Sequence, residues 1–226
     1  MTEAGGRQIE EILGTVELVI FDWDGTLMDS TAKICNAMLA TAKAMDLPVP
    51  DWEAVEQLIG LSLGGAFEHL FGVLDSQQQE DLTAAYRHQY LTVDQTPTPL
   101  FQEALESLHY LRQQGYQLAV ATGKNRKGLN RVMGETKTEH FFATTRCADE
   151  AQSKPHPEMV LSIASELGVK PERSLVIGDT SFDMEMAHRG GMERIAVSYG
   201  AHRLEQLHPF EPVAVIDCLS ELRRIL

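Results

Sequence analysis

Residues 17–30 have the sequence Glu17-Leu18-Val19-Ile20-Phe21-Asp22-Trp23-Asp24-Gly25-Thr26-Leu27-Met28-Asp29-Ser30, and this stretch determines the fold that we expect. Residues 18–21 are continuously apolar, which is typical of a strand buried on both faces. Because side chains alternate along a strand, Asp22 and Asp24 point to the same side, and Gly25 lets the backbone turn away. Two such acids tolerate each other if a cation neutralises one of them or if one holds a proton. A simple strand end followed by an Asp-Gly turn is the alternative interpretation.

The composition indicates a soluble protein of a reducing cytoplasm. The 226 residues are 43% hydrophobic and 23% charged, enough for one large domain or for a domain with an insertion. Cys35, Cys147 and Cys218 are odd in number and far apart, so neither a disulfide framework nor a thiolate zinc site is expected. A formal net charge of −14 argues against a nucleic-acid or anionic membrane surface. If the substrate is an anion, basic side chains within the binding pocket must therefore bind it, because the protein as a whole is negatively charged.

A helical block follows the first strand directly. Residues 1–15 are predicted to be a loose leader without a function, and Ser30 is an expected helix N-cap. Helices are predicted over residues 31–46, 51–58, 66–74 and 77–93, with a flexible loop over residues 59–65. The strand-free block 31–93 is therefore interpreted as an inserted cap domain. The core would comprise residues 16–30 and 94–226.

From Phe101 onward, helices and strands alternate. The pattern predicts strands at residues 116–121, 141–145, 174–177, 194–198 and 213–216, separated by helices that include one from Pro155 to Leu167. Alternation of this kind requires right-handed crossovers and a parallel sheet covered on both faces. We therefore expect a doubly wound α/β fold with an inserted helical domain.

Polar residues follow several of the expected strands. Thr122 and Gly123 come after the second strand, Asp179 follows the strand of residues 174–177 with Asp183 close behind, and Lys154 precedes a helix that begins at a proline. Ligands bind at the carboxyl ends of parallel strands, and carboxylates, free backbone amides and a lysine suit a magnesium and phosphate site. Taken singly, each residue also fits an ordinary turn, a solvated lysine or a first-turn helix acid.

Together these residues resemble a known family. Asp22-Trp23-Asp24-Gly25-Thr26, Thr122, Lys154-Pro155 and Gly178-Asp179-Thr180-Ser181-Phe182-Asp183 stand in the order of the four motifs of the haloacid dehalogenase-like hydrolases. The resemblance covers nearly the whole chain after the leader. The helical insertion is similar to the cap of the subgroup that contains phosphoglycolate phosphatases, β-phosphoglucomutases and small pyrophosphatases.

The resemblance implies a role for each matching residue. Asp22 would be the nucleophile that forms an aspartyl-phosphate, and Asp24 would be the general acid and base. Thr122, Gly123 and Lys154 would hold the phosphoryl oxygens. Mg²⁺ would be bound by Asp22, the backbone carbonyl of Asp24, Asp179 and, directly or through water, Asp183. The cap loop with Gly60, Leu61, Ser62 and Leu63 would select the substrate.

The expected function is magnesium-dependent hydrolysis of a small phosphorylated metabolite, with phosphoglycolate as the first substrate to consider. A sugar phosphomutase or a pyrophosphatase is the alternative within the same fold. A non-catalytic interaction protein on this scaffold is the alternative of another class, although the intact acids argue against it. The sequence indicates no nucleic-acid or membrane partner and does not identify any protein partner.

Overall fold

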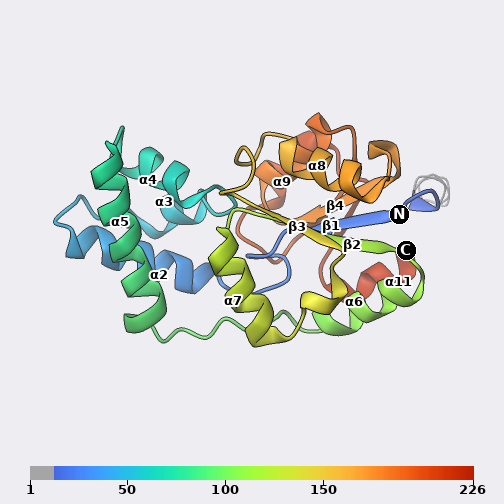
Figure 1. The fold of residues 1–226 in the computed structure, drawn as a ribbon, viewed down its shortest axis with the longest axis horizontal. Helices are drawn as coiled ribbons and strands as arrows, with labels where there is room; N and C mark the ends of the chain where they lie inside the picture. Colours follow the sequence, from blue (N-terminus) through green and yellow to red (C-terminus); the bar gives the residue numbers. More distant parts are fainter. Residues whose placement is uncertain (1–12) are drawn as a thin grey trace.

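The computed structural model describes residues 13–226 as a parallel α/β core with a group of helices to one side (Figure 1). The strands pair in the order β3-β2-β1-β4-β5-β6, and all pairings are parallel. Their bounds are β1 Leu18–Phe21, β2 Gln117–Thr122, β3 Thr144–Cys147, β4 Ser174–Gly178, β5 Glu193–Val197 and β6 Ala214–Ile216. This arrangement confirms the predicted doubly wound fold, with β1 between β2 and β4.

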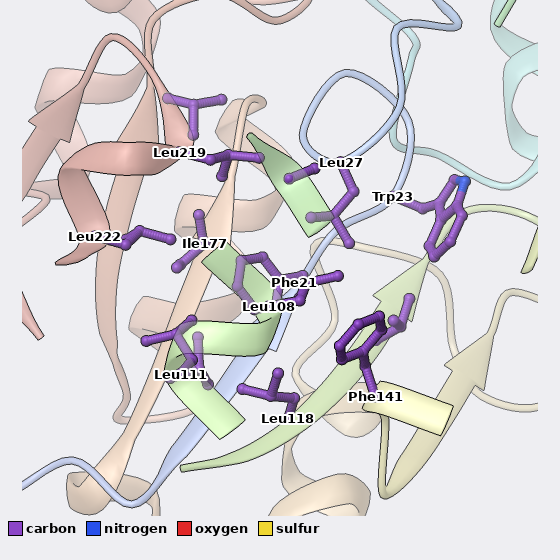
Figure 2. Packing of buried hydrophobic residues seen from close by; sticks show 14 of the residues in the cluster. Phe21, Trp23, Leu27, Leu108, Leu111, Leu118, Phe141, Ile177, Leu219 and Leu222 are labelled. Carbon is purple, nitrogen blue, oxygen red and sulfur yellow. The ribbon is translucent and has the colours of Figure 1, made fainter. Parts of the chain in front are cut away.

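Helices cover both faces of the sheet. Helices α6 (Ala104–Gln113), α7 (Arg126–Thr136) and α11 (Leu222–Ile225) lie on one face, and α8 (Glu158–Leu167) and α9 (Ser181–Arg189) lie on the other (Figure 1). Strand β1 shows why, because Val19 and Phe21 pack into the first layer and Leu18 and Ile20 into the second. Figure 2 shows the first layer, where Phe21, Leu108 and Leu222 come together. The core thus fixes the carboxyl end of β1 in the middle of the sheet.

The remaining helices between β1 and β2 form a separate group, which we call the helical lobe (residues 31–93). It has its own buried cluster, which includes Met38, Phe67 and Leu82. The lobe lies beyond the end of the sheet in Figure 1. Its elements are α2 Thr31–Ala44, α3 Trp52–Glu56, α4 Leu63–Phe71, α5 Ser76–His88 and the π-helix Gln89–Val93.

Several predicted element boundaries were wrong. Helix α4 begins at Leu63 rather than at residue 66, because the Ser62 hydroxyl accepts a hydrogen bond from Gly65 N and caps the helix. Helix α3 ends at Glu56, so the segment that connects the two helices comprises residues 57–62 instead of the predicted 59–65. A strand expected at residues 141–145 is instead β3 at Thr144–Cys147, since Phe141 is buried in a 3₁₀ turn. Helix α8 begins three residues after Pro155.

The first described residue, Leu13, belongs to the folded core. The predicted leader covers residues 1–15, of which residues 1–12 lie outside the described part. Leu13 packs in the core with an exposed fraction of 1%, so the end of this segment belongs to the folded structure. Among residues 13–226, no helix combines the length and the apolar character needed to cross a lipid bilayer.

Candidate active site

Three buried carboxylates meet at the carboxyl ends of β1 and β4. Asp22 follows β1, and its N–H donates to Ile177 O on β4 at 2.9 Å, so that the two strand ends stay adjacent. Asp179 follows β4, and Asp183 lies in the first turn of α9. The side chain of Thr180 caps this helix by accepting a hydrogen bond from Asp183 N. One oxygen from each of Asp22, Asp179 and Asp183 lies within 4.8 Å of the others. The sheet topology thus concentrates negative charge at one point.

Lys154 is the cation that the structure places among these acids. Its Nζ lies 2.7 Å from Asp22 Oδ1 and 2.6 Å from Asp183 Oδ1, and its side chain is fully buried. Burial opposes the charge, but Asp183 and Asp22 raise the pKa of Lys154 above its usual value. Burial also raises the pKa of Asp22 well above its ordinary value, Asp183 and Asp179 add to this rise, and Lys154 opposes it. The single positive charge of Lys154 therefore does not neutralise three ionised carboxylates.

Asp179 is held in place by short contacts from several segments. Its Oδ1 accepts from Thr26 Oγ1 at 2.8 Å and its Oδ2 from Ala201 N at 2.8 Å. Burial and the neighbouring Asp183 raise the pKa of Asp179 to about 7, against the opposing effect of these hydrogen bonds. A Cβ at Gly25 would lie 2.1 Å from Asp179 Oδ2, and one at Gly200 would lie 2.0 Å from Asp179 Cβ. Both glycines are required for this close packing.

The three acids fit a small divalent cation. Hard carboxylate oxygens are the ligands that Mg²⁺ prefers, and a cation would lower the cost of burying like charges together. Asp22 Oδ1 is paired with Lys154, and Asp22 Oδ2 accepts no hydrogen bond from any residue of 13–226. Asp22 Oδ2 thus has unused acceptor capacity. Among the described residues, the carboxylate of Asp24 is not part of this cluster, and metal binding by its backbone carbonyl stays a prediction.

The Asp24 carboxylate has two partners that sequence reasoning missed. Ser30 Oγ donates to Asp24 Oδ1 at 2.5 Å, and Lys124 Nζ lies 2.9 Å from the same oxygen. Ser30 was expected to cap helix α2, but its side chain makes no capping hydrogen bond. Lys124 follows Thr122 by two residues, and this spacing was the available signal. The two carboxylates of the opening stretch therefore lie in different environments.

Thr122 and Gly123 lie at the end of β2, next to β1. Thr122 is fully buried, and its Oγ1 accepts a hydrogen bond from Lys124 N at 3.2 Å, which stabilises the turn after the strand. Gly123 lies directly beneath the helical lobe, since a Cβ there would be 2.5 Å from Leu61 O and 2.6 Å from Gly60 O. Phosphate binding by these two residues stays a prediction.

The lobe contacts the core at further points around the site. Ser62 N donates to Ser153 Oγ at 3.0 Å, one residue before Lys154. His202, which is 3% exposed, accepts from Ser181 N through Nδ1 at 3.0 Å, and its Nε2 lies 3.2 Å from Gln57 O of the lobe. Burial lowers the pKa of His202, which favours the neutral ring that these contacts need. Sequence reasoning did not identify His202, because no spacing connects it to the lobe.

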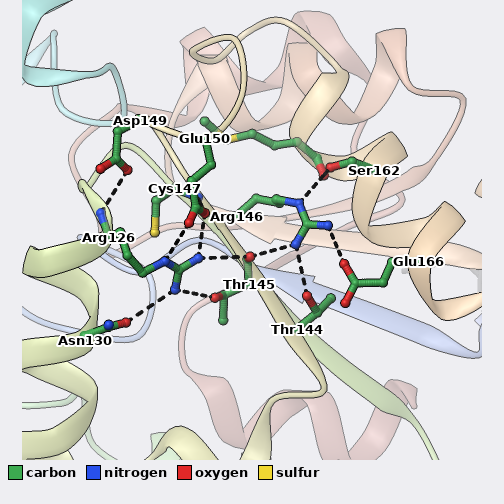
Figure 3. A network of polar contacts seen from close by, with 11 residues as sticks. Arg126, Asn130, Thr144, Thr145, Arg146, Cys147, Asp149, Glu150, Ser162 and Glu166 are labelled. Carbon is green, nitrogen blue, oxygen red and sulfur yellow. Dashed lines mark hydrogen bonds and ion pairs between the residues drawn. The ribbon is translucent and has the colours of Figure 1, made fainter.

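A polar network holds the loop that carries Lys154 (Figure 3). Arg126 Nε donates to Glu150 Oε1 at 2.8 Å, and Arg126 N donates to Asp149 Oδ1 at 2.9 Å. Cys147 N donates to Glu150 Oε2 at 3.0 Å, which joins the end of β3 to the same group. Ala148 N donates to the backbone carbonyl of Lys124 at 2.9 Å. The loops after β2 and β3 are therefore fastened together beside the site.

A cavity of about 490 Å³ lies between the lobe and the core. Asp22 and Asp24 line the cavity on the side of the core, and the residues Gly60, Leu61, Ser62 and Leu63 line it on the side of the lobe. The structure thus places the predicted specificity residues opposite the predicted catalytic acids. Lys154, Asp179 and Asp183 lie outside the lining, beneath Asp22. A ligand in the cavity would reach Asp22 from the lobe side, and Asp22, Asp179 and Asp183 would hold a metal.

Comparison with known proteins agrees with this architecture. A family model described as haloacid dehalogenase-like hydrolase matches residues 19–197. The protein named "Probable phosphatase IndB" of Dickeya dadantii is 36% identical over 212 residues, which are 91% of each chain. A phosphoglycolate phosphatase of Nitrosococcus oceani is 27% identical over 216 residues, covering 93% of this chain and 96% of that protein.

Solved structures show the same fold. A crystal structure titled as a predicted phosphoglycolate phosphatase from Haemophilus somnus superposes with a TM-score of 0.83 at 22% identity, covering 93% of this chain and 98% of the other. The family model spans most of the chain, and the IndB relative exceeds 30% identity over nearly its full length. The chain therefore belongs to the haloacid dehalogenase-like hydrolase family.

Proposed function

We propose that this chain is a magnesium-dependent phosphatase that hydrolyses a phosphate monoester through an aspartyl-phosphate on Asp22. The observation that carries the proposal is the division of the site. The buried carboxylates of Asp22, Asp179 and Asp183 lie together, with Lys154 paired to Asp22 and Asp183, whereas Asp24 lines the cavity separately with Ser30 and Lys124 as partners. A nucleophile beside cations and a separate acid and base are the groups that phosphoryl transfer requires.

The reaction then proceeds in two steps. A carboxylate oxygen of Asp22 attacks phosphorus, the bond to the ester oxygen breaks, and the leaving alkoxide takes a proton from Asp24. In the second step, Asp24 removes a proton from water, which attacks the phosphorus of the aspartyl-phosphate. Inorganic phosphate leaves, and the Asp22 carboxylate and the Asp24 proton are restored. Thr122, Gly123 and Lys154 would hold the phosphoryl oxygens in both steps.

The metal would be held by Asp22, Asp179, Asp183 and the backbone carbonyl of Asp24. Bound there, Mg²⁺ supplies positive charge that stabilises ionised Asp22 and reduces repulsion between the carboxylate and the anionic ester. This need follows from the site itself, because burial and two neighbouring acids raise the pKa of Asp22. Lys154 contributes in the same sense, but it is shared with Asp183.

The helical lobe is proposed to act as a cap domain over a core of residues 16–30 and 94–226. Support comes from the contacts of Gly60, Leu61 and Ser62 with the core, which enclose the space above Asp22 and Asp24. Such closure excludes water from the first step, when water would compete with the substrate.

The test is a screen for phosphate release from phosphorylated metabolites, with and without Mg²⁺. It includes phosphoglycolate, which the sequence analysis favours, together with pyrophosphate and hexose phosphates. We expect magnesium-dependent release that chelation abolishes and that Asp22→Asn lacks. Transfer of phosphate between sugar positions without release would indicate a mutase. Absence of both reactions in folded, magnesium-loaded protein would contradict the proposal and favour a binding protein.

A further inference from the structure

The cavity above Asp24 has an apolar side that the phosphate chemistry does not explain. Its lobe side is lined by Ile34, Met38, Leu58, Leu70 and Tyr86, and its volume of about 490 Å³ is within the range of sites that hold drug-sized ligands. A two-carbon acid such as glycolate would leave most of this space unfilled. The size and lining therefore favour a leaving group with a bulky apolar body.

Tyr90 adds a polar group to this apolar wall. Tyr90 lies four residues after Tyr86, the two ring centroids are 5.8 Å apart, and both rings line the cavity. Tyr90 is 7% exposed, and its hydroxyl oxygen is buried beside the Arg131 side chain and donates to no acceptor among residues 13–226. Buried hydroxyl groups in proteins nearly always donate to an acceptor, so this buried group has unused donor capacity next to the cavity.

Positive charge surrounds the Tyr90 ring. The Nζ atoms of Lys33 and Lys124 lie 5.3 and 5.6 Å from the ring centroid, and the Arg131 guanidinium carbon lies 5.9 Å from it. Lys33 is paired with Asp94, Lys124 with Asp24 and Arg131 with Glu135.

Two further cations line the same cavity. Arg87 and Lys127 make no ion pair with any residue that the structure describes. The cavity lining contains four cationic side chains, those of Arg87, Lys124, Lys127 and Arg131, and three acidic ones, those of Asp22, Asp24 and Asp149. In the whole sequence acidic residues outnumber basic ones by 33 to 19, so the lining is less acidic than the chain as a whole. An anion at this position would be attracted by the cations and would accept a hydrogen bond from Tyr90.

We propose that Tyr90 is a specificity-determining residue, and that the substrate is a phosphate monoester whose bulky apolar leaving group carries a second anionic group, bound by the Tyr90 hydroxyl and Arg131. The proposal rests on the phosphatase function proposed above, because it places the reacting phosphate at Asp22. It adds what the rest of the substrate must contain. Tyr90 touches the leaving group and takes no part in the two proton transfers assigned to Asp24.

The test compares phenyl phosphate with 3- and 4-carboxyphenyl phosphate in the presence of Mg²⁺. We expect the wild-type protein to prefer at least one carboxylated ester, mainly through a lower KM. Tyr90→Phe keeps the ring and removes only the hydroxyl. It should lower kcat/KM for the preferred carboxylated ester about tenfold or more, the value of a hydrogen bond to a charged group, and should change kcat/KM for phenyl phosphate less than about twofold. Arg131→Gln should reduce the same preference.

Tyr116→Phe is the matched control, because it also removes a phenol hydroxyl. That hydroxyl donates to Leu226 O at 3.1 Å, outside the cavity, so the control should leave the preference unchanged. Equal losses on both classes of ester in Tyr90→Phe, or no preference for either carboxylated ester in the wild type, would overturn the proposal.

A binding measurement separates this proposal from the phosphatase function. Calorimetry compares benzylphosphonate with 4-carboxybenzylphosphonate, which cannot be hydrolysed, on wild-type protein and Tyr90→Phe. Tighter binding of the carboxylated compound that Tyr90→Phe abolishes supports the specificity role even if no ester is turned over. Turnover of phenyl phosphate together with equal binding of both phosphonates would leave the phosphatase function intact and overturn the role of Tyr90.

Discussion

Gly123→Ala tests whether closure of the helical lobe is needed for catalysis. Gly123 lies at the end of β2, and the Cβ of an alanine there would be 2.5 Å from Leu61 O, 2.6 Å from Gly60 O and 3.0 Å from Gly60 C. Ordinary van der Waals contact begins at 3.4 Å, so the nearest carbonyl would have to move by about 0.9 Å. The atoms concerned are backbone, which cannot rotate away as the end of a flexible side chain can.

The size of the effect follows from the cost of overpacking. Extra atoms in a tightly packed contact cost about 1–3 kcal/mol, which corresponds to a shift of roughly 5- to 150-fold in the equilibrium between closed and open lobes. The core can keep its fold, because the clash is with a segment of the lobe. We therefore expect kcat/KM for an aryl phosphate to fall about 5- to 100-fold, with little change in Tm.

The assay combines steady-state kinetics with inhibition by inorganic phosphate. Gly64→Ala is the control, since its added Cβ would meet only Gln79 Oε1 at an ordinary 3.5 Å. A folded Gly123→Ala protein with kcat/KM within about twofold of the wild type would refute the requirement for closure. An equally large loss of phosphate affinity would instead mean that Gly123 acts by binding phosphate through its backbone.

Four further predictions concern the core. Asp22→Asn should form no acid-stable protein-bound phosphate with a labelled aryl phosphate, whereas Asp24→Asn should still form it and lose about 10²–10⁴-fold in turnover; accumulation in Asp22→Asn would contradict the assignment. Ser30→Ala should lower kcat about 3- to 10-fold with little change in KM, because Asp24 loses a positioning hydrogen bond; unchanged kcat would make Ser30 purely structural. Lys154→Met should lower the free energy of unfolding in urea by about 3–5 kcal/mol, and a loss below about 1 kcal/mol would mean that water reaches the acids. The pKa of Asp179 is about 7 in the folded protein and ordinarily 3.8, so between these pH values the metal-free folded state holds a proton that the unfolded state has lost. The stability of the metal-free protein should therefore fall as pH rises through this window, and the increase in Tm caused by Mg²⁺ should grow from about pH 5 to about pH 8. An increase in Tm that does not depend on pH would exclude competition between the proton and Mg²⁺ at Asp179.

The sequence by itself determined the fold class and the order of the polar groups. Local information sufficed, because a short apolar run that stops at Asp22 is typical of a buried strand end, and alternating strands and helices favour a parallel sheet. Asp22, Asp179, Asp183 and Lys154 come from distant parts of the chain, yet their positions after strands or before a helix already indicated one common edge. The structure places these four residues together, and their roles in catalysis stay predictions.

Only the tertiary structure decided which groups face Asp24 and Asp22. Ser30 looked like a helix cap, and only the position of Lys124 two residues after Thr122 distinguished it from a solvated lysine, but both contact Asp24 once the turn after β2 lies beside β1. Sequence patterns record the periodicity of each element, whereas the partner of a side chain depends on the distance between elements that are far apart in the chain. Tyr90 illustrates the same limit, because an amphipathic helix pattern shows that a tyrosine is buried but does not show that its hydroxyl donates to no acceptor.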